Sequence, residues 1–207
     1  MINFIHKYIL PKEVDFNAVI LKQASVTRKI VSYIQKACSK NDISTLDLIT
    51  EEVAFARELK TQNMKQLLDV LITPYDKESI FRIITQLDWI ALSVKHFHLE
   101  IVEYKLQSLE DYQTIAEKLL DMSNLLENGI GQLPAQNLTL INSNIDQIVE
   151  LYDQVISTCA KASAELLQHN DLVTIIRGKD VILQLKEIAK RIHVVANTLE
   201  DMAIKVV

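Results

Sequence analysis

Hydrophobic residues recur along the chain with the spacing of long helices that pack against one another. In the C-terminal part they are separated by alternating steps of three and four: Ile182, Leu185, Ala189, Ile192, Ala196, Leu199, Ala203 and Val206. Such steps place apolar side chains on one stripe of a helix that faces a partner helix. The same steps recur over residues 80–104, 109–133 and 138–166. The pattern therefore predicts four long helices.

Two less regular helices are predicted before these, over residues 14–39 and 44–72, with a short helix over residues 2–9 that ends before Pro11. Pro74 should end the third of these helices near Leu71 or Ile72. Asp76 and Asp171 are expected N-caps of the helices that follow them. The six long helices divide into two sets of three near residues 107–109. We therefore expect a single domain over residues 1–207, with one three-helix repeat at about 12–107 and a second at about 108–207.

The scarcity of glycine and proline supports an all-α fold of long antiparallel helices. The 207 residues include only 3 Gly and 3 Pro, and residues 12–73, 75–128 and 135–177 contain neither. β-Sandwiches, barrels and alternating α/β folds need such turn residues at short intervals. Gly129 and Gly131 are predicted to stop a helix. Gly178 falls in the first turns of the last helix, which it should weaken by about 1 kcal/mol relative to alanine.

Charge and targeting signals restrict the function further. The net charge is −5, and no basic stripe interleaved with aromatic residues is present, so nucleic acid is not an expected partner. No run approaches about 18 apolar residues, and the N-terminal apolar run carries Lys7 without a signal-peptide cleavage site. We therefore expect a cytoplasmic protein. Cys38 and Cys159 form no metal-binding motif and are expected to be buried, reduced thiols.

Candidate chemistry is limited to carboxylates. The chain contains no Glu-x-x-His pair, P-loop or dinucleotide-binding motif, and no nucleophile–base pair stands out. His96 and His98 are two residues apart and so point in different directions on a helix. Asp146, Glu150 and Asp153 share one side of a helix, and Glu58 and Asp88 lie on two earlier helices. These acids either form a solvated face or supply oxygen ligands to a metal between helices.

Two segments carry a family resemblance. Residues 71–90 read LITPYDKESIFRIITQLDWI, and residues 175–205 contain a V-A-N-x-x-E pattern at residues 195–200. Both resemble the PhoU-like regulators often paired with Pit-type inorganic phosphate transporters. Matching positions are Ile72, Thr73, Pro74, Asp76, Glu78, Ile80, Leu87, Asp88, Arg191, Val195, Ala196, Asn197 and Glu200, whereas Lys77 and Ser79 depart from the pattern.

This resemblance implies an all-α, PhoU-like fold of two three-helix bundle repeats and a cytoplasmic role beside phosphate uptake. The implied partner is a membrane phosphate transporter or its accessory protein. The family also typically carries multinuclear iron or zinc sites, held by Asp and Glu side chains in both halves.

The chain departs from the family at those ligand positions. Trp89 and Leu92 follow Asp88, and the last helix has Lys190, His193 and Val194 in place of acidic residues. On the third helix, Phe55 and Arg57 replace expected carboxylates and leave only Glu58; on the sixth, the acids shift upstream to Asp146, Glu150 and Asp153. Because a hard cation needs several converging oxygens, we predict that the metal clusters are lost or reduced and expect no cofactor. The residual candidate ligands are Glu58, Asp88, Asp146, Glu150 and Asp153.

Three functions stay open at this stage. The first is a non-enzymatic regulator of phosphate transport that acts by protein contact. The second is a metal-binding helical bundle, and the third is a helical scaffold unrelated to phosphate. Four aromatic residues either close the core or form the face of a homodimer: Phe55, Phe81, Trp89 and Phe97.

Overall fold

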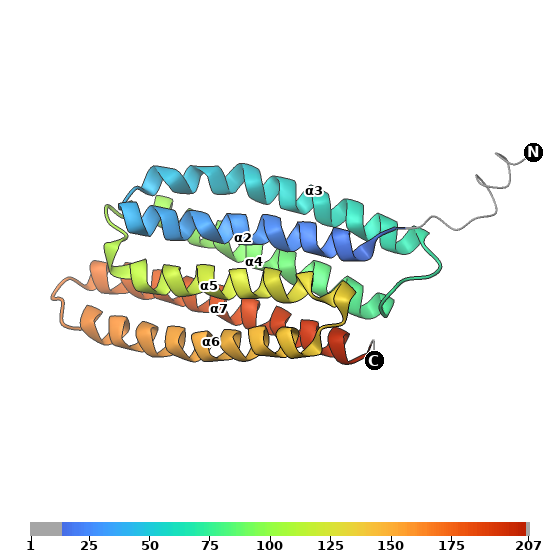
Figure 1. The fold of residues 1–207 in the computed structure, drawn as a ribbon. Helices are drawn as coiled ribbons and strands as arrows, with labels where there is room; N and C mark the ends of the chain where they lie inside the picture. The colour runs from blue at the N-terminus through green and yellow to red at the C-terminus, as the bar shows by residue number, and fades with distance from the viewer. Residues whose placement is uncertain (1–13, 206–207) are drawn as a thin grey trace, which may run out of the picture.

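The computed structural model describes residues 14–205, and these form an elongated bundle of six long helices (Figure 1). The helices are α2 (Phe16–Lys40), α3 (Leu48–Asp69), α4 (Lys77–Glu103), α5 (Gln113–Gly131), α6 (Leu138–Leu166) and α7 (Leu172–Lys205). Short 3₁₀ turns lie at Ile43–Asp47, Glu110–Tyr112 and Leu133–Ala135. Residues 14–205 contain no strand. The short helix expected over residues 2–9 lies outside the described residues.

The helices form two sets of three that join through a central group of four. The pairs α2 with α5 and α4 with α7 make extensive contacts between the two sets. α3 packs along α2 and α4 at one edge of the molecule, and α6 packs along α5 and α7 at the opposite edge (Figure 1). The predicted architecture of two three-helix repeats is therefore confirmed. One hydrophobic cluster runs through both sets.

The apolar stripes of the predicted helices, here called their seams, form this core. Seven of the eight seam residues of the last helix, from Ile182 to Ala203, are at most 4 % exposed; Val206 lies outside the described residues. A polar network that the sequence pattern did not predict lies within the first set. The Gln23 side-chain amide donates to the Ile84 carbonyl at 2.8 Å and accepts a hydrogen bond from the Asn63 amide at 2.7 Å. Cys38 and Cys159 are free and buried, and burial raises their pKa values to about 12 and about 11.

The third predicted helix ends earlier than expected. α3 stops at Asp69, and Val70 has an extended backbone conformation (φ −97°, ψ 135°). This conformation buries Val70 and Tyr75 against the core, and Lys77 Nζ donates to the carbonyl of Val70. α4 ends at Glu103, next to the end of the predicted pattern at residue 104, and Lys105 then adopts a left-handed conformation (φ 52°). These ends follow from the burial and hydrogen bonding of the connecting segments.

The predicted helix stop lies where it was expected, because α5 ends at Gly131. Neither Gly129 nor Gly131 has a positive φ, however, and the left-handed residue in this connection is Gln136 (φ 51°). Gly129 is needed for a close approach instead: a Cβ there would lie 2.8 Å from Leu199 Cδ2. A close approach also explains the glycine at position 178. A Cβ there would lie 2.7 Å from Leu166 Cδ2, where the end of α6 meets the start of α7.

The two expected N-caps behave differently. Asp171 accepts hydrogen bonds from the amides of Val173 and Thr174 and from the Thr174 hydroxyl, as predicted. Asp76 occupies the N-cap position of α4, but its carboxylate accepts from the Ser79 hydroxyl at 3.4 Å and makes no capping bond to the backbone. Among residues 14–205, none of the helices has a stretch long and apolar enough to cross a bilayer.

Candidate functional site

α4 forms one wall of two grooves, one shared with α7 and one shared with α3. Polar contacts along its length hold it antiparallel to α7. Arg82 pairs with Asp201 at 2.5 Å, and the Tyr104 hydroxyl donates to Asp180 at 2.8 Å. Gln184 donates to Glu100 at 2.6 Å, and burial of the Glu100 carboxyl raises its pKa. These contacts fix which α7 residues face each turn of α4.

The α4/α7 groove encloses about 230 Å³ and is lined by Gln86, Trp89, Glu187, Lys190, Arg191 and Val194. The Arg191 guanidinium lies over the Trp89 ring, 5.8 Å from its centroid, and Arg191 Nε forms an ion pair with Glu187 Oε1 at 2.9 Å. The groove therefore brings together Trp89, Lys190 and Val194, three positions where the family resemblance implies carboxylates. One carboxylate and two cations line it, which does not suit a divalent cation.

The α3/α4 groove is larger, about 760 Å³. Its lining residues are Thr50, Val53, Ala54, Arg57, Glu58, Thr61, Gln62 and Lys65 from α3, with Leu92 and Lys95 from α4. Three cations and one carboxylate give it a local charge of +3 − 1 = +2. None of these four charged side chains forms an ion pair or side-chain hydrogen bond with the rest of residues 14–205. Arg57 and Leu92, two more positions where the resemblance implies carboxylates, thus meet in one groove.

Among the residual metal-ligand candidates, Asp88 is neutralised by a lysine. Its carboxylate is nearly buried and accepts from Lys60 Nζ at 2.6 Å. Glu58 is exposed and lines the α3/α4 groove. Because a cation occupies the open side of Asp88, these two acids do not make the oxygen-rich shell that a metal needs.

The other three candidates lie at the far edge of the molecule. Asp146, Glu150 and Asp153 are exposed on α6, which packs on α5 and α7, whereas α3 forms the opposite edge (Figure 1). Their exposure is that of a solvated face, one of the two alternatives that the sequence allowed. Nowhere in residues 14–205 do three His, Cys, Asp or Glu side chains converge in a way that could hold a metal ion.

His96 and His98 lie in different surroundings, as their spacing predicted. His98 is buried, with Nε2 3.5 Å from Asp47 Oδ1, whereas His96 is exposed. His193 stacks on Tyr152, with ring centroids 4.8 Å apart. Of the four aromatic residues proposed to close the core or form a dimer face, only Phe97 is fully buried. Phe55, Phe81 and Trp89 are between 44 % and 52 % exposed.

Sequence reasoning missed Lys65 and Lys95, which line the α3/α4 groove. Lys65 shares a helix with Arg57, eight residues away, so a helical projection of α3 could have placed them on neighbouring surfaces. Lys95 belongs to another helix and is brought to them only by the pairing of α3 with α4.

No protein-family model matches the sequence, and a comparison with curated proteins gives no match. Two solved structures from Shewanella oneidensis MR-1 share the fold. One, described as a PhoU-like phosphate regulatory protein, aligns with a TM-score of 0.79 at 14 % identity and covers 91 % of this chain and 98 % of its own. The other, described as a PhoU-like protein, aligns with a TM-score of 0.81 at 13 % identity over 92 % and 99 %. The predicted PhoU-like fold is therefore confirmed.

Proposed function

We propose that this protein is a non-enzymatic regulator of inorganic phosphate transport that acts by protein contact on the cytoplasmic side of the membrane. The observation that carries the proposal is the end-to-end structural match with a PhoU-like phosphate regulatory protein, which leaves only a small part of either chain outside the alignment. Because the alignment covers nearly all of both chains, it includes the connections between the helices and is not limited to one three-helix bundle. The quoted resemblance around Thr73, Pro74 and Asp76 independently supports the same assignment.

The proposed partner is a membrane phosphate transporter or its accessory protein. Recognition would use helix surfaces, and α4 offers two grooves that open to solvent beside half-exposed Trp89 and three cations without ion-pair partners. Aromatic side chains and arginines of this kind are enriched where proteins meet.

The role in phosphate transport is tested by deleting the gene in its native host and measuring uptake of labelled orthophosphate in phosphate-rich and phosphate-poor medium. We expect the deletion to change uptake in at least one medium and a plasmid copy to restore it. An adjacent phosphate permease gene would add support. Unchanged uptake in both media would contradict the proposal and favour a helical scaffold unrelated to phosphate.

We further propose that the protein functions without an iron or zinc cluster. The support is chemical: Trp89, Lys190 and Arg191 occupy the α4/α7 groove, and Lys60 occupies the open side of Asp88. Elemental analysis by ICP-MS of untagged protein should find less than stoichiometric iron and zinc. Added Fe, Zn or Mn should leave the melting temperature unchanged, and replacing Asp146, Glu150 and Asp153 by amides should not alter either result. Stoichiometric metal would contradict this proposal.

A homodimer stays a prediction. Phe55, Phe81 and Trp89 are the half-exposed aromatic residues that such a contact would bury. Multi-angle light scattering measures the mass of the protein in solution and distinguishes the monomer from the dimer.

A further inference from the structure

We propose that the α3/α4 groove binds an acidic amphipathic helix of a partner protein. The inference rests on the proposed function only in taking the partner to be a protein, and it names the surface and the chemistry of that contact. It is carried by three observations: the charge of the groove, its length and its floor.

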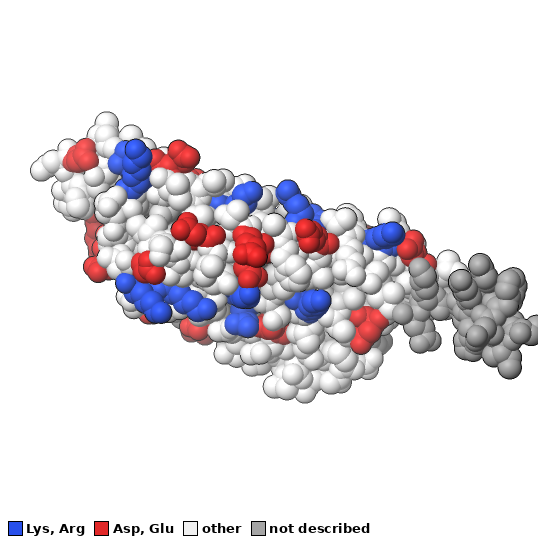
Figure 2. All heavy atoms as spheres, turned by 90° about the horizontal axis from the view of Figure 1, so that it is seen from above, with Lys and Arg blue, Asp and Glu red and all other residues white. Residues whose placement is uncertain are grey.

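The first observation is a set of cations without carboxylate partners. Within residues 14–205, some basic side chains form ion pairs, such as Arg28 with Glu127, Lys29 with Glu52 and Arg82 with Asp201. Others, such as Lys22, Lys161 and Lys179, lie singly on the exposed surface. The α3 edge of the bundle, seen from above in Figure 2, carries both basic and acidic residues. The groove differs because Arg57, Lys65 and Lys95 line it with only Glu58 as counter-charge, although the chain as a whole is acidic. Opposite charge on a partner is the complement that such a groove selects.

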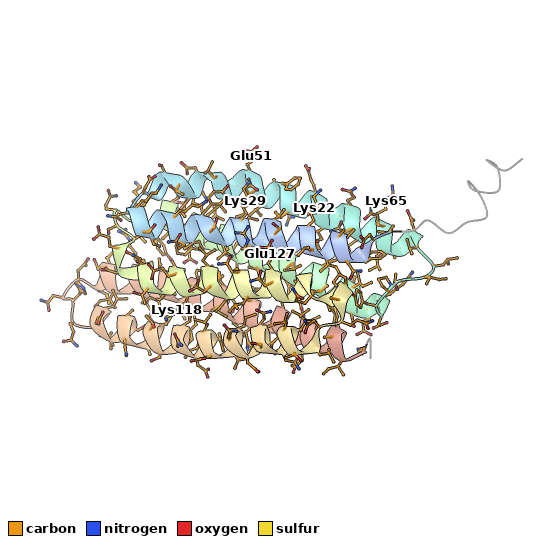
Figure 3. All side chains as sticks on the ribbon, in the orientation of Figure 1. Lys22, Lys29, Glu51, Lys65, Lys118 and Glu127 are labelled. Atoms are coloured by element: carbon orange, nitrogen blue, oxygen red, sulfur yellow. The ribbon has the colours of Figure 1, made fainter. Side chains whose placement is uncertain are left out.

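The second observation is the length of the groove. Its lining on α3 extends from Thr50 to Lys65, fifteen positions and about 22 Å at 1.5 Å per residue. Arg57 and Lys65 are eight positions apart, about 12 Å along the helix axis. Lys65 points outward from the bundle (Figure 3). A partner helix with carboxylates about two turns apart would match this spacing and contact each of the two cations.

The third observation is the floor of the groove. Val53, Ala54 and Leu92 supply apolar surface, and the short side chains of Thr50 and Thr61 leave space between the longer cations. A bound helix would place an apolar stripe on this floor and its acidic residues at the rim. This is the helix-in-groove mode of recognition, in which apolar anchors three or four residues apart supply contact area.

The test uses fluorescence anisotropy with a fluorescein-labelled helical peptide of about 16 residues, with leucines on one face and glutamates two turns apart beside it. A peptide of the same composition in scrambled order is the control. We expect saturable binding of the designed peptide. The variant Arg57→Glu/Lys65→Glu/Lys95→Glu should bind at least about tenfold more weakly.

A second triple variant controls for net charge. Lys22→Glu/Lys161→Glu/Lys179→Glu changes the charge by the same amount at exposed positions outside the groove, so its affinity should change by less than about threefold. A peptide with lysines in place of glutamates should bind the groove variant better than the wild type. That charge-swap rescue would show that the groove variant retains its binding surface, and circular dichroism would confirm its helix content.

Four results would overturn the proposal. They are absence of saturable binding to the wild type, equal loss in the two triple variants, competition by millimolar orthophosphate, and self-association that the groove variant abolishes. The third would assign the groove to a small anion and the fourth to a second copy of the chain. Because the assay uses only the purified protein and a peptide, its failure is independent of the uptake experiment that tests the proposed function.

Discussion

Gln23 and Asn63 show how a buried polar pair specifies the packing of the first three helices. Both are almost fully buried, and Gln23 connects α3 to the Ile84 carbonyl of α4. Removing one partner leaves the other without a hydrogen bond in a place that water does not reach. The sequence pattern could not reveal this pair, because polar residues within an irregular seam look the same whether they are solvated or paired.

We predict that Gln23→Leu lowers the free energy of unfolding by about 1–3 kcal/mol, because it leaves the Asn63 amide unsatisfied. The double variant Gln23→Leu/Asn63→Leu should recover part of that loss. Urea denaturation measures both, and exposed Gln147→Ala should change stability by less than about 0.5 kcal/mol. Equal stability of Gln23→Leu and the wild type would show that this pair does not contribute to the free energy of unfolding.

Gly129 and Gly131 should respond in opposite directions to alanine. A Cβ at Gly129 would lie 2.8 Å from Cδ2 of the fully buried Leu199, whose side chain would have to repack, so we expect a loss of about 1–2 kcal/mol in unfolding free energy. A Cβ at Gly131 meets only Leu21 Cδ1 at 3.8 Å, an ordinary contact. Alanine there should stabilise by up to about 1 kcal/mol through helix propensity. Parallel urea titrations test both, and a stabilising Gly129→Ala would refute the close approach.

Asp171 should make stability depend on pH. Hydrogen bonds from the Thr174 hydroxyl and from the amides of Thr174 and Val173 lower the pKa of its carboxyl below the ordinary value. A lowered folded-state pKa means that the stabilisation is present above the unfolded-state value, about 3.9, and is lost as pH falls through the folded-state value. Asp171→Ala should therefore lower the melting temperature at neutral pH and have little effect near about pH 2. A pH-independent difference would contradict this assignment.

At the level of elements, the helices were predictable where their boundaries depend on local chemistry. α6 occupies the predicted residues 138–166, because a regular seam follows Asn137, whose side chain accepts from the Leu140 amide. The end of α3 was not predictable, since it depends on the burial of Val70 and Tyr75 in a core formed by the other helices. Local signals thus set the starts of helices better than they set the ends.

The contact between Trp89 and Arg191 should couple α4 to α7. A double-mutant cycle with Trp89→Leu and Arg191→Gln should give a coupling energy of about 0.5–1 kcal/mol, the range for exposed cation–π pairs. The cycle separates this contact from the ion pair of Arg191 with Glu187. Lys190 lines the same groove without such a contact, so a Trp89/Lys190 cycle should give a value near zero. Equal coupling in the two cycles would contradict the geometry.

Across the whole molecule, the continuous core predicts cooperative unfolding. Contacts of α2 with α5 and of α4 with α7 join the two sets of helices. Trp89 is the only tryptophan and reports on the contact between α4 and α7, whereas far-ultraviolet circular dichroism reports on all the helices. Urea transitions followed by the two signals should coincide. Two separate steps in the dichroism would show that the repeats unfold separately.

The sequence could predict several residues of the candidate site, but it could not predict how they are arranged in space. The family resemblance marked Trp89, Leu92, Lys190, Val194 and Arg57 as departures, because each replaces an expected carboxylate. Their division between two grooves depends on how α3, α4 and α7 pack, which no short stretch of sequence encodes. Nothing in the sequence around Lys95 therefore marked it as a residue of the candidate site.

α4 is a wall that the two grooves have in common, and this has a thermodynamic consequence. A molecule that fills the α3/α4 groove and shifts α4 also changes the spacing between Trp89 and Arg191 in the α4/α7 groove. Binding in one groove is then linked to binding in the other by a single coupling free energy, equal in both directions. A helix shared by two grooves is in this sense a transmitter, through which two partners on separate surfaces would affect each other's affinity without touching.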